Sequence, residues 1–257
     1  RVLAVPRLTV NAQESFTALL PQEVTAHFLK RLRLYVLRAK VSLQESTQVL
    51  LGFSGTLAAD VLANAGFDLP TTTFTVKHNP NCQIWHMGDT RFVVLTDVTQ
   101  AIALWQTAQA AGICPVGSQT WEYTEIQAGW PNVFATTQEA FVPQMLNLDT
   151  LGGVAFNKGC YPGQEIVART HYLGKVKRHL FLARSATMLP ALGSDLFVPE
   201  HDESAGKIVN AHPHPEGGAL ILAVLRADWC AQQPPRLLSQ TGEALVCLPL
   251  PYSVDTP

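Results

Sequence analysis

The first 112 residues alternate between helical and strand-like hydrophobic patterns. Apolar residues recur about every 3.6 positions from Val24 to Val36, which predicts a helix that opens at Pro21. Ser54 is placed to cap a second helix at 57–65, ending at Gly66. A third helix is expected at 99–111, and strands at 1–10, 41–51, 71–77, 83–87 and 91–95. This order is typical of an α+β fold with helices on one face of a mixed sheet.

The pattern changes after residue 118. A helix is expected at 118–128, and the stretch 131–162 then shows little periodicity. A loop of that length inside a compact domain is usually functional. Another helix is expected from Gly163 to about His171. Beyond Gly174, short strands separated by Gly and Pro predict a small barrel or sandwich, with strands at 178–184, 195–198, 207–211, 218–225 and 244–248.

Composition and charge narrow the class of protein. Hydrophobic residues make up 47% of the 257 residues and charged residues 15%, so a sizeable core can form and wholesale disorder is excluded. The formal charge of −2 argues against a general nucleic-acid coat but leaves a local basic patch open. The chain opens without Met on Arg1, in what reads as the middle of a strand, so we expect an upstream segment to be missing.

The five cysteines are scattered and include no C-x-x-C pair. They therefore predict neither a disulfide framework nor a metal cage within one chain, and they favour a reducing compartment. No apolar run is long enough to span a membrane and no signal peptide is visible, so a cytoplasmic protein without a membrane partner is expected.

The densest group of chemically useful residues lies between Phe156 and Glu165. Glycines and a proline predict a tight loop that leads into a helix near Gly163. A thiol before a helix N-terminus, with Lys158 two residues away, is expected to have a lowered pKa, which makes Cys160 the candidate reactive or ligating thiol. The alternative is an inert Cys in a turn. His171 lies too far along the helix to be a convincing base partner.

Other features allow two interpretations each. The basic stretch of Arg169, Lys175, Lys177 and Arg178 is either a solvated face or an anion site for a polycarboxylate or an RNA phosphate. The aromatic residues around Trp130 are either core or a stacking surface for a planar heterocycle. The His-Pro-His-Pro run at 212–215 is more typical of a rigid loop than of a metal site. Phosphate-loop, dinucleotide-binding and G-x-S-x-G motifs are absent.

The run from Lys158 to Glu165 reads K-G-C-Y-P-G-Q-E and resembles the K-G-C-Y-x-G-Q-E signature of the YgfZ family. The segments 128–131, 141–153, 165–169 and 249–253 resemble further family motifs, so the resemblance covers nearly the whole chain. That family comprises folate-binding proteins of iron–sulfur cluster assembly and repair, also described as tRNA-modifying. They are related to the aminomethyltransferase (T-protein) of the glycine cleavage system.

The resemblance implies a three-domain, T-protein-like ring around a folate channel. Residues 1–112 would form a ferredoxin-like α+β domain, 113–173 the remainder of a split folate-binding domain, and 174–257 a C-terminal β-barrel. An N-terminal segment of the family would be missing. The resemblance assigns the reactive function to Cys160 and Lys158. For tetrahydrofolate it implies these contacts: Tyr161, Gly163, Gln164, Glu165, Gln127, Trp130 and Arg169.

Gln127 departs from the family, where Glu is common in the corresponding I-E-A-G run. A Gln offers a carbonyl acceptor and an NH₂ donor but no charge, so weaker binding of the pterin N–H groups is expected. The catalytic carboxylate of the transferase would belong to the missing segment.

The leading expectation is a tetrahydrofolate-binding accessory protein for iron–sulfur enzymes, including those that modify tRNA, acting through Cys160. Its partners would be reduced folate, the client enzymes and, indirectly, tRNA. Whether it catalyses a reaction stays open. The main alternative is a folate-dependent one-carbon transferase. A thiol-dependent hydrolase lacks a convincing His partner, and a scaffold that binds folate or RNA without chemistry is a further alternative.

Overall fold

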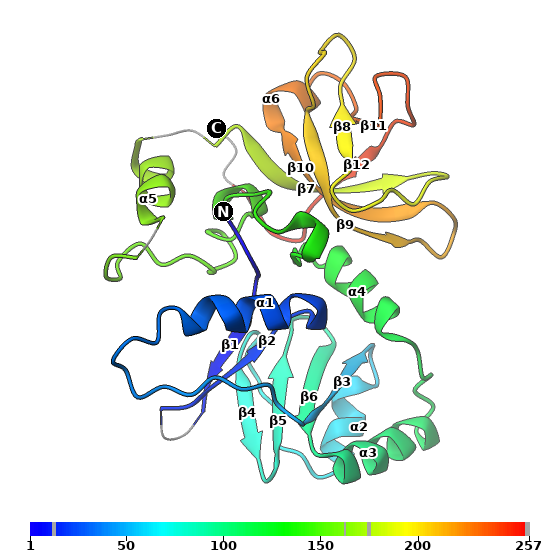
Figure 1. The fold of residues 1–257 in the computed structure, drawn as a ribbon. Helices are drawn as coiled ribbons and strands as arrows, with labels where there is room; N and C mark the ends of the chain where they lie inside the picture. Colours follow the sequence, from blue (N-terminus) through cyan, green and yellow to red (C-terminus); the bar gives the residue numbers. More distant parts are fainter. Residues whose placement is uncertain (12–13, 162, 174–175, 255–257) are drawn as a thin grey trace. The chain divides into compact units, whose positions relative to one another are not determined.

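The computed structural model describes residues 1–11, 14–161, 163–173 and 176–254 (Figure 1). Contacts between Cα atoms divide the chain into two compact units. The first unit comprises Arg1–Arg7, Leu19–Tyr35 and Glu122–Pro257, and the second comprises Leu8–Ala18 and Val36–Trp121. The division into three domains at residues 112 and 173 stays a prediction. No helix among the described residues is both long and apolar enough to cross a bilayer.

The second unit is built on a four-stranded sheet in the order β3-β6-β5-β4. Its strands are β3 Val49–Ser54, β4 Val76–Asn79, β5 Cys82–His86 and β6 Arg91–Thr96. All three pairings are antiparallel, so the expectation of a mixed sheet was wrong. The tight turns between β4, β5 and β6 explain this, because Asn81, Gly88 and Asp89 adopt positive φ and reverse the chain directly.

Helices α2 (Ala58–Asn64) and α3 (Val98–Ala110) pack on this sheet. The central strand β6 is buried along its whole length, as its unbroken apolar run indicates. Asp97 caps α3 by accepting the Gln100 backbone N–H at 2.9 Å. Ser54 does not cap α2, contrary to expectation: it is the last residue of β3, and the helix starts at Ala58 without a side-chain cap.

The expected strand at 41–51 was also misplaced. Strand β3 begins only at Val49, where its pairing with Thr96 of β6 begins, and residues 41–48 form no regular element. These preceding residues are mostly exposed, so they have no apolar face to bury in a sheet. Two short strands, β1 (Arg7–Val10) and β2 (Phe16–Leu19), form a separate two-stranded sheet.

The first unit contains a six-stranded antiparallel sheet in the order β11-β8-β9-β10-β7-β12. The strands are β7 Arg178–Ser185, β8 Asp195–Phe197, β9 Gly206–Pro213, β10 Ala219–Arg226, β11 Arg236–Leu237 and β12 Val246–Leu248. Its helices are α1 Gln22–Arg33, α4 Ser118–Gln127, which begins in the second unit, α5 Gln164–Leu173 and α6 Ala227–Cys230. Short 3₁₀ helices lie at Ala135–Thr137 and Pro143–Leu146.

Strand β10 contributes side chains to the cores on both faces of this six-stranded sheet. Its alternate residues belong to two different cores, as the period of two in a strand requires. Leu220, Leu222 and Val224 pack with the segment from Ile126 to Leu148. Ala219, Ile221, Ala223 and Leu225 pack with the remaining strands. The sheet therefore packs against the irregular segment after α4 with one face and against the C-terminal strands with the other.

Candidate functional site

The loop between Phe156 and Gly163 holds the predicted thiol, and Cys160 is exposed in it. Lys158 is exposed as well, and its Nζ lies 4.5 Å from the centroid of the Tyr161 ring, which is a cation–π distance. The Tyr161 carbonyl accepts the Gln164 N–H at 3.1 Å, which starts α5. Gly163 has φ +88°, a conformation in which other residues would be strained. Pro162 lies outside the described residues.

Aromatic rings connect this loop to α5. Phe156 stacks on His171, with ring centroids 3.7 Å apart and planes 13° apart. Tyr172 meets both rings edge-on. The imidazole of His171 therefore packs against an apolar ring of the loop, and no contact between it and Cys160 is seen in the described part of the chain.

Helix α5 is exposed on most of its surface. Among the α5 residues whose side chains are described, Val167 is the buried one. The buried Gln144 side chain donates to the Val167 carbonyl at 2.7 Å and so holds the helix in place. Glu165 and Arg169 are exposed, and Gln164 is half-buried. The helix thus presents polar and charged groups to solvent beside the cysteine loop.

A buried polar network surrounds the end of α4. Glu125 is only 3% exposed, and its Oε1 lies 2.8 Å from Arg7 Nη2 in an ion pair without hydrogen-bond geometry. Glu125 Oε2 accepts from Asn132 Nδ2 at 2.6 Å. The Asn210 side chain pairs with the Asn132 backbone, accepting its N–H at 3.0 Å and donating to its carbonyl at 2.9 Å. This network joins Asn132, which directly follows the 128–131 segment, to strand β9.

Sequence reasoning missed Glu125 and chose Gln127, which the structure places at the exposed end of α4. One feature of the sequence indicates the buried Arg7–Glu125 ion pair. Arg7 is the single charge between Val2 and Val10, in a segment of alternating apolar residues. A lone charge in such a segment needs a buried partner of opposite charge.

A cavity of about 540 Å³ opens beside this network. It is lined by Glu23, Glu122, Ile126, Trp130, Asn132, Phe134, Ala135, Thr136, Leu189, Pro190, Ala191, Leu192, Asn210 and Ala211. Burial raises the pKa of the Glu122 carboxyl; His212 opposes the shift, and the nearby Glu125 and Glu23 add to it. The wall therefore combines aromatic rings, buried amides and a carboxyl that holds its proton more tightly than usual.

Comparison with curated proteins identifies relatives along most of the chain, although no protein-family model matches it. It is 34% identical over 233 residues to tRNA-modifying protein YgfZ from Yersinia pseudotuberculosis, covering 88% of this chain and 70% of that protein. The proteins of the same name from Yersinia pestis and Yersinia enterocolitica match at the same identity and coverage. The chain belongs to the YgfZ family. The predicted resemblance is thereby confirmed.

The fold of this YgfZ-family chain is similar to a solved aminomethyltransferase. The crystal structure of glycine cleavage system aminomethyltransferase T from Bartonella henselae matches with a TM-score of 0.76. The match covers 96% of this chain and 70% of that one, at 17% sequence identity. The expectation of a mixed α and β, T-protein-like fold is thus confirmed at the level of the fold.

The structure brings together only some of the predicted site residues of this family member. Lys158 and Tyr161 are in contact, and Gln164, Glu165 and Arg169 follow on the adjoining helix. Among the predicted residues that the structure describes, Trp130 alone lines the cavity. The roles of all these residues stay predictions.

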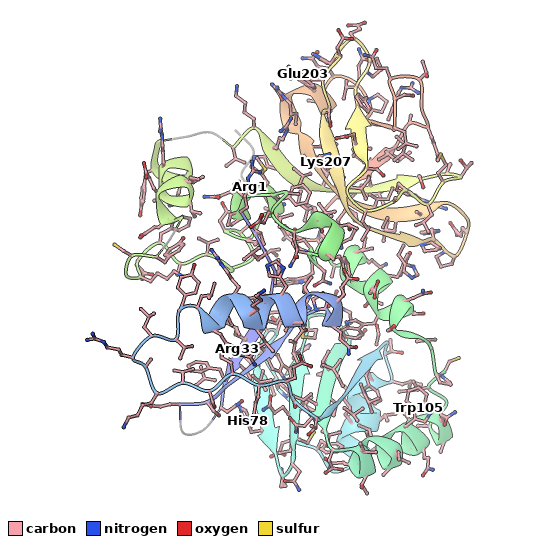
Figure 2. All side chains as sticks on the ribbon, viewed as in Figure 1. Arg1, Arg33, His78, Trp105, Glu203 and Lys207 are labelled. Carbon is pink, nitrogen blue, oxygen red and sulfur yellow. The ribbon has the colours of Figure 1, made fainter. Side chains whose placement is uncertain are left out.

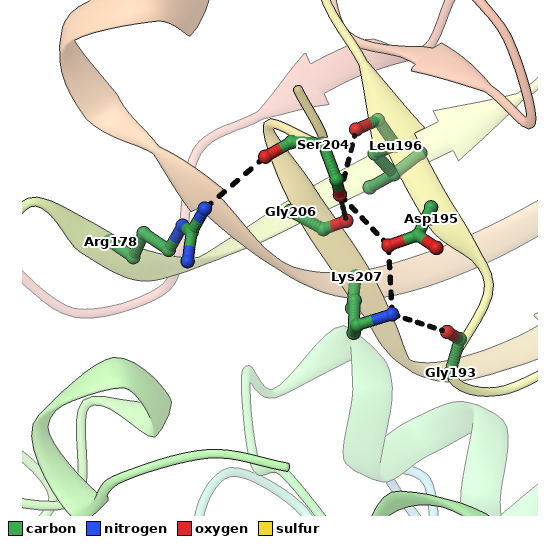
Figure 3. Close-up of polar contacts among 7 residues, drawn as sticks. All are labelled: Arg178, Gly193, Asp195, Leu196, Ser204, Gly206 and Lys207. Atoms are coloured by element: carbon green, nitrogen blue, oxygen red, sulfur yellow. Dashed lines mark hydrogen bonds and ion pairs between the residues drawn. The ribbon is translucent and has the colours of Figure 1, made fainter. Parts of the chain in front are cut away.

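The basic residues that follow α5 differ in their surroundings. Arg178 is half-buried, and its Nη2 donates to the Ser204 carbonyl at 3.2 Å (Figure 3). Ser204 in turn donates to Asp195, which pairs with Lys207 at 2.8 Å. Arg178 is thus part of the packing of the β8–β9 turn, whereas Lys177 is exposed. Lys175 lies outside the described residues.

The two histidines of the His-Pro-His-Pro run lie at the edges of the Tyr123 ring, with centroids 5.8 and 5.9 Å away. In the described ranges, no group of three His, Cys, Asp or Glu side chains is arranged to hold a metal ion.

Proposed function

We propose that this YgfZ-family protein binds reduced folate and supports the assembly or repair of iron–sulfur enzymes, including enzymes that modify tRNA. Cys160 would be its reactive group. The observation that carries the proposal is the exposed Cys160 in the K-G-C-Y-P-G-Q-E loop, beside the Lys158–Tyr161 pair. The family relationship supports it, because the curated relatives are named tRNA-modifying proteins. A cytoplasmic location remains part of the proposal.

Exposure matters because the client would be another protein. A thiol on a loop can reach a cluster held by a partner, and its thiolate form would donate to iron after releasing its proton to solvent. One thiol cannot hold a cluster alone, since clusters usually take four ligands. Cys160 would therefore share or transfer a ligand position, and Lys158 would stabilise the negative charge on sulfur.

The cavity beside Trp130 suits reduced folate in size and chemistry. Its volume falls within the usual range for small-molecule sites. Trp130 and Phe134 offer apolar faces to a bicyclic ring, and the Glu122 carboxyl and Asn132 amide offer polar partners for its N–H and carbonyl groups. Bound tetrahydrofolate would supply a one-carbon carrier. In this proposal Gln127, Arg169 and the loop residues Tyr161, Gly163, Gln164 and Glu165 remain further contacts to be tested.

Tetrahydrofolate titration by calorimetry tests this site. We expect saturable binding in the micromolar range, and Trp130→Ala should weaken it roughly tenfold because a stacking surface is lost. Trp105→Ala is the matched control, since Trp105 lies on α3 in the other unit (Figure 2) and is not one of the residues that line the cavity. Absence of binding at millimolar folate, or equal affinity of the Trp130 variant, would remove folate from the proposal.

A one-carbon transferase is the second candidate, favoured by the aminomethyltransferase-like fold and by Glu122. A carboxyl with a raised pKa is suited to act as a general base near neutral pH. Release of a one-carbon folate from an aminomethyl donor, abolished in Glu122→Gln, would favour this candidate. Folate binding without turnover would favour the accessory role.

A further inference from the structure

The cysteine loop and the segments after it form one of two stretches of the chain with a strong local excess of positive charge; the other is 24–44, with five Lys and Arg and no Asp or Glu. Residues 150–194 contain six of the 18 Lys and Arg residues but only one of the 20 Asp and Glu residues, Glu165. The remainder of the chain is therefore net acidic. Such a local excess in an acidic protein favours contact with an anionic partner over a uniformly solvated surface.

Of the five of these cations that the structure describes, three are exposed to solvent: Lys158 in the loop, Arg169 on α5 and Lys177 just before β7. Arg184 is half-buried and pairs with Glu216. Arg178 is half-buried, with its Nη2 bonded to the Ser204 carbonyl, so it is not counted among the exposed cations. Glu165 lies one helical turn before Arg169, so it compensates one charge at most. Within 150–194, the exposed positive charge of the described residues thus lies on α5 and on the segments at its two ends.

Aromatic rings lie among these cations; His171 and Tyr172 are exposed, and Phe156 and Tyr161 are half-buried. Phe156, His171 and Tyr172 contact one another, and the ring of Tyr161 lies under Lys158. Tyr172 is 67% exposed although it touches both of its ring neighbours. Its orientation is therefore fixed from one side while the rest of the ring is open. Arg169 lies three residues before Tyr172, on the same side of the helix.

We propose that α5 and the loop 156–161 form a binding surface for single-stranded RNA, such as a tRNA loop. The cations would contact phosphates, and an unstacked base would stack on Tyr172. The fixed, exposed ring of Tyr172 favours RNA over an acidic protein, because Asp and Glu side chains have no aromatic ring to stack on it. The proposal goes beyond the proposed function, in which tRNA is reached only through client enzymes, and it does not depend on folate.

Fluorescence anisotropy with a labelled single-stranded RNA, its duplex form and unfractionated tRNA tests the surface. We expect the single strand and tRNA to bind more tightly than the duplex. Tyr172→Ala should weaken single-strand binding about five- to a hundred-fold through the lost stacking. Lys177→Gln should reduce the slope of log affinity against log salt by about 0.7.

Trp105→Ala and Lys77→Gln are matched controls, because they remove an exposed aromatic ring and an exposed cation outside both basic stretches. Both should bind RNA as the wild type does. Tetrahydrofolate binding measured on the same samples should be unchanged in the Tyr172 and Lys177 variants, which separates a failure of this proposal from a failure of the folate proposal.

Two outcomes would overturn the RNA surface. One is the absence of binding to any of the three RNAs at low salt. The other is displacement of RNA by polyglutamate at equal charge, together with an unchanged affinity in Tyr172→Ala, which would assign the surface to an acidic protein.

Discussion

At the scale of single residues, the buried charges were the hardest to foresee. Glu125 and Gln127 are two positions apart on α4, yet one is buried in an ion pair and the other is exposed. The sequence could place both on a helix, but the partners of Glu125 come from residues 7 and 132. Only the fold brings those side chains together. The local sequence pattern therefore could not show which of Glu125 and Gln127 is buried.

Cysteine reactivity is a residue-scale prediction. Cys160 and Cys114 are exposed, whereas burial raises the pKa of Cys82 to about 11 and that of Cys230 to about 12. Burial also raises the pKa of the Cys247 thiol, although the residue as a whole is exposed. Because the thiolate is the nucleophile, iodoacetamide at pH 8 should modify Cys160 and Cys114 first.

Peptide mass spectrometry after short exposure gives the order of modification. Urea-unfolded protein, in which all five thiols should react at similar rates, is the control. Equal labelling of Cys82 or Cys230 and Cys160 in the folded protein would contradict the burial of those two thiols.

At the scale of elements, alternation and turn residues predicted most of the strands. The apolar runs at β6 and β10 and the glycines around them located central strands, because those strands are buried on both faces. The strand at 41–51 failed because β-branched residues alone do not supply a pairing partner. The short elements α6 and β11 were not predicted, since each is too short to show a period.

Gly206 in β9 gives an element-scale prediction. A Cβ at this position would lie 1.8 Å from the Val224 carbonyl oxygen of β10, closer than two such atoms can approach. Gly206→Ala must therefore push β9 and β10 apart, and we expect a loss of about 1–3 kcal/mol in the free energy of unfolding.

Gly117→Ala is the matched control, because a Cβ there meets nothing within 4 Å, and it should change stability by less than about 0.5 kcal/mol. Urea unfolding followed by circular dichroism measures both variants. If Gly206→Ala is as stable as the wild type, the close approach of the two strands described here is wrong.

At the scale of the whole molecule, the signature from Lys158 to Glu165 predicted the family correctly. The hydrophobic pattern by itself gave an α+β first half and a β-rich end, and it could not have suggested the aminomethyltransferase-like fold. The cavity beside Trp130 was also beyond the sequence, because its wall combines residues from α1, α4, the 189–192 segment and β9. Packing of distant segments, rather than local propensity, creates such a site.

The central claim is that Cys160 is required for the proposed support of iron–sulfur enzymes. A complementation experiment in cells tests this claim most directly. The measurement is the activity of an iron–sulfur tRNA-modifying enzyme in bacteria that lack their own YgfZ-family protein and express variants of this one. We predict that Cys160→Ser reduces the activity to that of cells without the protein, whereas Cys114→Ser, which alters another exposed thiol, retains it. Full activity with Cys160→Ser at equal protein levels would contradict the account.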